Sequence, residues 1–216
     1  MDEATGGRST SSVRRRDFGW PSELETVDGL TTTTLARTVI DISRWDSFLN
    51  GVVAADAALH GLELGPQTVT LAPSSLLDAT HEALPVRGSG KIRQVLEFAD
   101  GASASPGESL SRVNMRRLRL PAPELQVRFE DGDGEMFVDF CWPWLQLIGE
   151  FDGAGKYTRE QMTQGRSVAE VVLDEKRRED RLRALGWRVV RWGWDDALRP
   201  ERLRSILWQA GLRPVP

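Results

Sequence analysis

Cysteine and histidine are scarce in this chain of 216 residues: the only cysteine is Cys141, and the only histidines are His60 and His81. This scarcity excludes disulfide frameworks, zinc ribbons and cysteine–histidine metal cages, so any metal would have to be bound by oxygen ligands. Long apolar runs are also missing. No stretch approaches the roughly 18 residues of a membrane span, and the N-terminus has no apolar signal core. We therefore expect a cytoplasmic protein with no membrane partner.

The charge is unevenly distributed along the chain. The formal net charge is −4, which argues against a general nucleic-acid binder. From residue 156 onwards, however, 14 Lys and Arg stand against 9 Asp and Glu, whereas residues 1–155 carry 14 against 23. Arginine dominates the basic part, and its planar guanidinium suits phosphate. Two interpretations follow: a phosphate-binding surface, or solvated helix faces with internal ion pairs.

The first half of the sequence predicts a helical subdomain after a lead-in. Residues 1–26 are polar, rich in Ser and Arg and without periodicity, so we expect them to be loosely ordered. Between residues 27 and 101, apolar residues recur at helical spacing in three stretches, with threonines as N-caps before the first and Gly61 closing the second. The segment "GASASPG" then breaks the pattern, and we place a second domain at residues 103–216.

The second half predicts an α/β fold. A helix begins at Ser105, and "ELQVRFE" alternates like a strand, with Leu125, Val127 and Phe129 expected on one face. "DGDG" is a hairpin signal between this strand and "EMFVDFCW". A third strand is expected over residues 144–152, followed by the charged helix "AEVVLDEKRREDRLRALG" and the strand "WRVVRWGW". The order helix, three strands, helix, strand predicts a mixed sheet flanked by helices.

Three carboxylates on the expected strands form the candidate site. Glu150 and Asp152 share one face of their strand, and Asp139 lies inside the apolar run "FVDFCW". A carboxylate in a buried strand is costly unless it is paired or binds a metal. If the two strands are neighbours in the right register, the three acids converge. Oxygen ligands alone suit Mg²⁺ or Mn²⁺, and Lys156 follows near the strand end.

Each of these residues also has a purely structural interpretation. Arg191 on the last strand would neutralise Asp139 or Glu150 without any metal. Glu108 completes a capping box with Ser105. On the charged helix, Glu175 and Arg178 share the apolar stripe, so they either satisfy one another or line the same polar pocket as the acids.

The string "VDFCWP…LIGEFDG…EKRREDRLRALGWRVVRW" resembles the C-terminal domain of actinobacterial proteins related to the very-short-patch-repair endonuclease, within the PD-(D/E)XK superfamily. The resemblance covers residues 103–198 and implies a restriction-endonuclease-like core. It makes Asp139 the first acid and Glu150 the acid of the second strand. Glu108 matches an acid that the first helix of this fold sometimes contributes.

This resemblance implies a Mg²⁺- or Mn²⁺-dependent DNA endonuclease in phage defence or DNA repair, with Asp139 and Glu150 holding the metal. Asp152 stands at the lysine position of the "(D/E)XK" triplet, where it would complete or orient the metal shell. Lys156 or Lys176 would replace the lysine that assists the attacking water. The arginines expected to follow the DNA backbone are Arg177, Arg178, Arg181 and Arg188.

The segment "VDGLTTTTLARTVIDISR…VVAADAALHG" resembles the middle segment of AbiE-type abortive-infection antitoxin proteins, which usually begin with a winged helix that is missing or truncated here. It supports a second hypothesis, a catalytically inactive regulator with a nuclease fold that binds DNA or a protein. A homodimer and a protein partner in a defence or toxin–antitoxin system both stay open.

Overall fold

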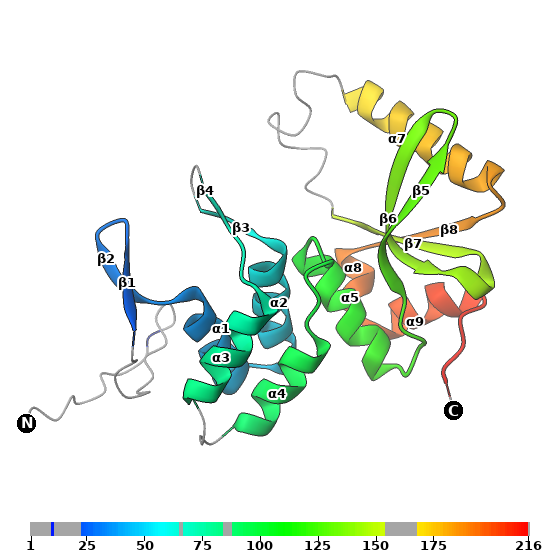
Figure 1. Cartoon of the computed structure of the whole chain (residues 1–216). Coiled ribbons are helices and arrows are strands. Elements are labelled where there is room, and N and C mark those ends of the chain that lie inside the picture. Colours follow the sequence, from blue (N-terminus) through cyan, green and yellow to red (C-terminus); the bar gives the residue numbers. More distant parts are fainter. Residues whose placement is uncertain (1–9, 11–22, 65–66, 84–87, 154–167, 216) are drawn as a thin grey trace, which may run out of the picture.

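The computed structural model is a mixed α/β fold, and it describes residues 10, 23–64, 67–83, 88–153 and 168–215 (Figure 1). Its main sheet has the strand order β5-β6-β7-β8, in which β5, β6 and β7 are antiparallel and β8 runs parallel to β7. Two small hairpins, β1-β2 and β3-β4, lie apart from this sheet. Among the described residues, none of the helices combines the length and apolar character that a membrane crossing requires.

The N-terminal part contains the three expected helices, together with a fourth helix (Pro73–Ala83) and two hairpins that were not expected. Thr34 caps the first helix by accepting a hydrogen bond from the Arg37 amide, and Gly61 ends the second with a φ of 124°. Strand β1 begins inside the stretch expected to be loosely ordered, whose residues 1–9 and 11–22 lie outside the described part. The elements are β1 (Leu24–Val27), β2 (Leu30–Thr33), α1 (Leu35–Trp45), α2 (Phe48–His60), β3 (Leu62–Leu64), β4 (Gln67–Val69), α3 (Pro73–Ala83) and α4 (Ser89–Phe98).

The C-terminal part confirms the expected order of helix, three strands, helix and strand. The "DGDG" turn is confirmed as well, because Asp131 pairs with Gly134 across it. The elements are α5 (Pro106–Arg117), β5 (Glu124–Asp131), β6 (Gly134–Trp142), the 3₁₀ turn η1 (Pro143–Leu145), β7 (Leu147–Asp152), α7 (Val168–Ala184), β8 (Arg188–Gly193), α8 (Trp194–Ala197) and α9 (Pro200–Gln209).

Two expectations about this part were incomplete or wrong. The third strand begins at Leu147 and not at residue 144, because η1 and the left-handed Gln146 (φ 46°) intervene. The sequence interpretation also ended with β8, whereas helices α8 and α9 continue the domain. Leu203 and Leu207 of α9 are fully buried, so this helix is an integral part of the core.

Midway along strands β5 and β6, the apolar side chains move from one face of the sheet to the other. Leu125 packs in the cluster with α5 and α9, whereas Val127 and Phe129 pack in the cluster with α7. The expectation that these three residues share one face was therefore wrong. The cause is a break in the alternation at Gln126, whose φ is 46°. On β6, Phe137 and Cys141 lie two residues before and after Asp139, which is opposite this break, and Phe137 is exposed while Cys141 is buried.

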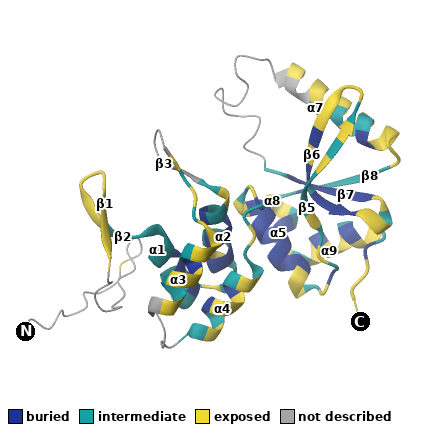
Figure 2. Ribbon diagram, in the orientation of Figure 1, coloured by how far each residue is buried: buried dark blue, intermediate teal, exposed yellow. Residues whose placement is uncertain are grey.

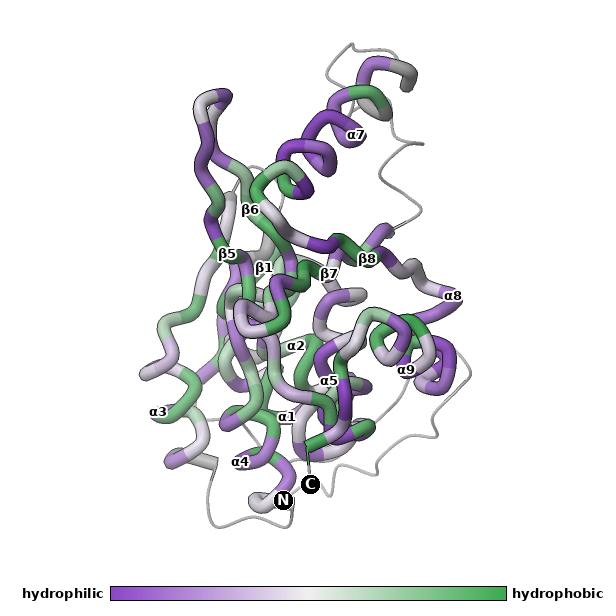
Figure 3. The backbone as a smooth tube through the Cα atoms, turned by 90° about the vertical axis from the view of Figure 1, so that its right-hand side faces the viewer, coloured by the Kyte–Doolittle hydropathy of each residue, from purple (hydrophilic) through white to green (hydrophobic). Residues whose placement is uncertain are grey.

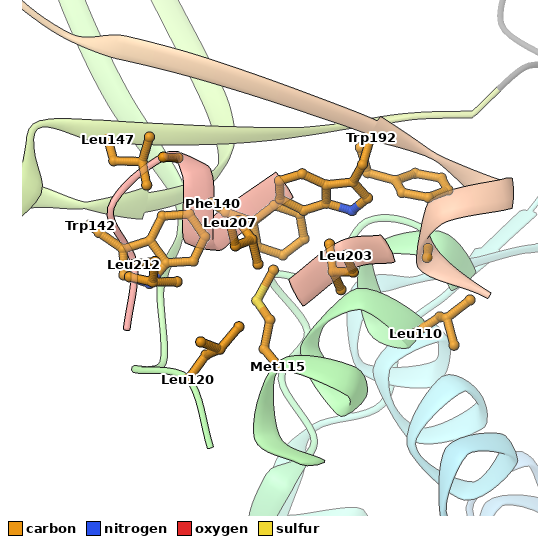
Figure 4. Packing of buried hydrophobic residues seen from close by; sticks show 13 residues of the cluster. Leu110, Met115, Leu120, Phe140, Trp142, Leu147, Trp192, Leu203, Leu207 and Leu212 are labelled. Atoms are coloured by element: carbon orange, nitrogen blue, oxygen red, sulfur yellow. The ribbon is translucent and has the colours of Figure 1, made fainter. Parts of the chain in front are cut away.

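The largest core lies between the sheet and helices α5 and α9 (Figures 2 and 4). Trp142 and Trp192 are buried in it, and each indole N–H has an acceptor: Pro121 O at 3.0 Å and Ser111 Oγ at 2.8 Å. Gly149 is required at this interface, since a Cβ there would lie 2.5 Å from the Trp192 ring. The members labelled in Figure 4 are Leu110, Met115, Leu120, Phe140, Trp142, Leu147, Trp192, Leu203, Leu207 and Leu212.

A buried ion pair joins the N-terminal helices to α5. Asp56 of α2 accepts a hydrogen bond from Arg112 Nη1 at 2.9 Å and another from Ser109 Oγ at 2.7 Å. Burial, the largest cause, raises the pKa of Asp56, while its hydrogen bonds and Arg112 oppose the rise. Because a buried ion pair cannot lose one partner cheaply, α2 and α5 are held in one arrangement.

Candidate functional site

The candidate site lies where strands β6 and β7 stop pairing. Their ladder covers only Phe140–Trp142 against residues 147–149. The next opposed positions are Asp139 and Glu150, and here the Asp139 carboxylate, not a β6 carbonyl, accepts the Phe151 amide at 2.8 Å. The expected neighbourhood of Asp139 and Glu150 is therefore confirmed, and both acids stand at the point where the sheet opens.

Glu150 is a buried carboxylate beside a second acid. Its exposure is 7%, and burial raises its pKa to about 7, with the charge of Asp139 as the second cause. Arg178 and Arg191 lower this pKa and only partly offset the rise. Near neutral pH Glu150 is thus poised between its protonated and ionised forms, because burial and the charge of Asp139 outweigh the two arginines.

Arg178 of α7 is the ion-pair partner of Glu150. Its Nη2 lies 2.9 Å from Glu150 Oε1 and also donates to the Phe137 carbonyl, while its Nη1 lies 3.3 Å from Glu175 Oε1. Both arrangements considered for Glu175 and Arg178 therefore occur together: they pair with one another, and Arg178 reaches the acids.

Arg191 has other partners than the sequence suggested. Its guanidinium binds Glu175 and Glu179 of α7, and it acts on Glu150 only through its charge. The neutralising arginine of Glu150 is thus Arg178. Together the five side chains form a charged network between β7, β8 and α7, and Figure 3 shows that α7 is largely hydrophilic along its length.

Asp152 does not complete a three-acid site. It is half-buried at the end of β7, one alternation beyond Glu150. In the described ranges, no three Asp, Glu, His or Cys side chains are grouped so that they could hold a metal ion. The expected convergence of Asp139, Glu150 and Asp152 was therefore wrong for the third residue, because β6 no longer accompanies β7 at that point.

Glu108 and Gln126 form a second polar group on the α5 side. Glu108 is buried, and it accepts hydrogen bonds from Ser105 Oγ at 2.7 Å and from the Ala104 amide at 2.9 Å. Its helix-capping role is therefore confirmed, although the amide that it binds is that of Ala104 and not that of Ser105. Gln126 Nε2 donates to Glu108 Oε2 at 3.3 Å. Gln126 was missed, although the hairpin register that pairs Asp131 with Gly134 places it opposite Asp139.

Of the two candidate lysines, Lys176 is the one within the described residues. Lys156 lies outside the described residues. Lys176 is exposed on α7, and Arg178, two residues further on, points to Glu150 instead. The described part of the site therefore takes its positive charge from arginine.

All four arginines expected on DNA have intramolecular acceptors. Arg178 binds Glu150, Arg181 binds Asp131 at the hairpin tip, and Arg188 donates to the carbonyls of Ala210 and Leu145. Arg177 is 67% exposed and meets only Asp174 at 3.3 Å in the described structure. Internal ion pairs thus account for much of the basic surface, and Arg177 is the most accessible arginine of α7.

Asp139 and Glu150 fit a Mg²⁺ or Mn²⁺ ion by number and type of ligand. Mg²⁺ usually keeps several waters and takes one or two carboxylates together with substrate phosphates, so it needs no cage of three protein acids. A cation between these two acids would remove the repulsion that raises the pKa of Glu150. The cation would have to share Glu150 with Arg178 or displace it.

Comparison with known proteins found two relatives in Mycobacterium tuberculosis. The uncharacterised proteins MT2308 (strain CDC 1551 / Oshkosh) and Rv2248 (strain ATCC 25618 / H37Rv) are each 33% identical to this chain over 186 residues. The match covers 85% of this chain and 63% of each relative, so the chain spans less than two thirds of their length. No protein-family model and no solved structure matches the chain.

Proposed function

We propose that this protein is a Mg²⁺- or Mn²⁺-dependent DNA endonuclease with a restriction-endonuclease-like core. The observation that carries the proposal is the placement of Asp139 beside buried Glu150 where β6 and β7 separate. Support also comes from the order helix, three strands, helix and strand, which the family resemblance in residues 103–198 implies. The proposal keeps the expected cytoplasmic location, where DNA is accessible.

In this function Asp139 and Glu150 would hold the metal, which would supply Lewis-acid stabilisation of the phosphate charge. The amide of Phe151 fixes the Asp139 carboxylate, so one of its oxygens is already oriented. Gln126, which lies opposite Asp139 in the β5–β6 register and donates to Glu108, would orient a water molecule beside Asp139. Arg177, the most accessible arginine of α7, would contact the DNA backbone.

A plasmid-nicking assay tests the proposal. With Mg²⁺ or Mn²⁺, wild-type protein should nick supercoiled plasmid or cut single-stranded DNA, and Asp139→Asn and Glu150→Gln should each lose on the order of 100-fold or more in rate. Glu135→Gln is the matched control, because it removes an exposed acid from the same strand, β6. Calorimetric titration of Mn²⁺ should lose its binding isotherm in the two site variants. Cleavage that survives both substitutions would refute the assignment.

The alternative is a catalytically inactive regulator that binds DNA or a protein partner. One observation favours it: Arg178 forms an ion pair with Glu150, as expected for a fold that has lost its metal site. A regulator should shift a DNA duplex in EDTA, show no cleavage with any divalent cation, and bind equally well after Glu150→Gln. Wild-type protein that neither takes up Mn²⁺ nor nicks DNA would support this alternative.

A further inference from the structure

Arg178 is already bound to the carboxylate of Glu150, which would have to hold the cation. Its guanidinium touches Glu150 Oε1 at 2.9 Å and is 23% exposed, so solvent reaches the pair from one side. The charge that it supplies is the same kind that a divalent ion would bring. Two cations at one carboxylate oxygen repel one another, so their binding cannot be independent.

Arg178 also has a second acidic partner. Glu175, one turn earlier on α7, already accepts from Arg178 Nη1 at 3.3 Å. Arg191 of β8 binds Glu175, and Glu179, one turn further along α7, binds the same Arg191 guanidinium. The Arg178 guanidinium can therefore release Glu150 and keep an acidic partner, which makes the movement much cheaper than the release of a charge with only one partner.

We propose that Arg178 is a resident counter-ion that a divalent cation displaces from Glu150, so that metal loading frees its guanidinium for a substrate phosphate. This inference rests on the proposed function, because it assumes that Asp139 and Glu150 bind the metal. The displaced arginine keeps its contact with Glu175 and turns its Nη2 donor outward. A guanidinium is suited to this second task because it binds phosphate with two parallel donors. Arg178 is a positioning residue that links the loading of the metal to the binding of DNA.

Calorimetric titration of Mn²⁺ tests the competition directly. Arg178→Gln should bind Mn²⁺ about tenfold more tightly than the wild type, because a positive charge beside the site is gone. Arg178→Lys keeps a charge and should stay close to the wild type. The matched control is Arg177→Gln, which removes a charge from the adjacent, 67% exposed position of the same helix and should leave the Mn²⁺ affinity unchanged. Circular dichroism verifies that each variant is folded.

A second measurement uses the wild-type chain and does not depend on the folding of a variant. The arginine side-chain Nε–H resonances are recorded by NMR during titration with diamagnetic Mg²⁺, and Arg178→Lys assigns the Arg178 signal by its absence. We expect this signal to shift as Mg²⁺ saturates. The signal of Arg181 should not move, because that residue is bound to Asp131 at the hairpin tip.

The outcomes separate the inference from the proposed function. Equal Mn²⁺ affinity of the wild type and Arg178→Gln, with an unmoved Arg178 resonance, would overturn the displacement while the metal site stands. No Mn²⁺ uptake by either protein would overturn both, and Arg178 would then be a permanent partner of Glu150. The inference is supported if Arg178→Gln binds Mn²⁺ more tightly than the wild type, Arg178→Lys and Arg177→Gln do not, and the Arg178 resonance of the wild type shifts.

Discussion

The two faces of the main sheet have opposite chemistry. The face against α5 and α9 is apolar and closed, with Phe140 and Trp192 stacked at 5.2 Å between ring centroids. The face against α7 has a smaller apolar cluster at one end and the charged network of Glu150, Arg178 and their neighbours at the other. Burying charges adds less stability than burying apolar surface. The first face therefore holds the fold together, whereas the second carries the chemistry that the fold can support.

The largest expected effect comes from breaking the closed face. Trp192→Ala should lower the free energy of unfolding by about 3–5 kcal/mol, because it leaves a cavity and removes the donor to Ser111. Denaturant unfolding followed by circular dichroism measures the change. Trp144→Ala is the matched control, since Trp144 is 61% exposed and its removal should cost much less. Similar losses of stability in the two variants would contradict the conclusion that this face holds the fold together.

The charged face should make the free energy of unfolding depend on pH. In the presence of EDTA, the folded pKa of Glu150 is about 7 and its unfolded value is about 4.5. A folded pKa above the unfolded one means that Glu150 supports stability below about pH 4.5, and that this support is lost as pH rises through 7. Wild-type stability should therefore fall between about pH 4.5 and 7 relative to Glu150→Gln. Parallel pH profiles for the two proteins would show that Glu150 is not perturbed.

The smallest effect is expected outside both faces. Arg128 lies on β5 and pairs with Glu130 and Glu135, and all three side chains are at least half exposed. Solvent screens such pairs, so Arg128→Gln should change the free energy of unfolding by less than about 0.5 kcal/mol. A change as large as that of a core variant would mean that surface charges hold the hairpin in place.

Local patterns in the sequence predicted much of the C-terminal fold. The periodicities of α5, β5, β6, β7, α7 and β8 and the "DGDG" turn were sufficient for the element order. Helices α8 and α9 were missed, because the interpretation stopped at the last strand. The left-handed conformation of Gln126 was also invisible, since nothing in "ELQVRFE" marks a break.

The sequence by itself determined that the candidate site would offer carboxylates and not cysteine or histidine, and that Asp139 and Glu150 would lie on consecutive strands. Both follow from composition and alternation, which are local properties. Only the tertiary structure decided that Arg178 pairs with Glu150, that Arg191 binds α7 instead, and that Asp152 stays outside the pair. These contacts join residues that lie far apart in the chain. They depend on where β6 and β7 separate and on how α7 lies over the sheet, and no short pattern encodes either.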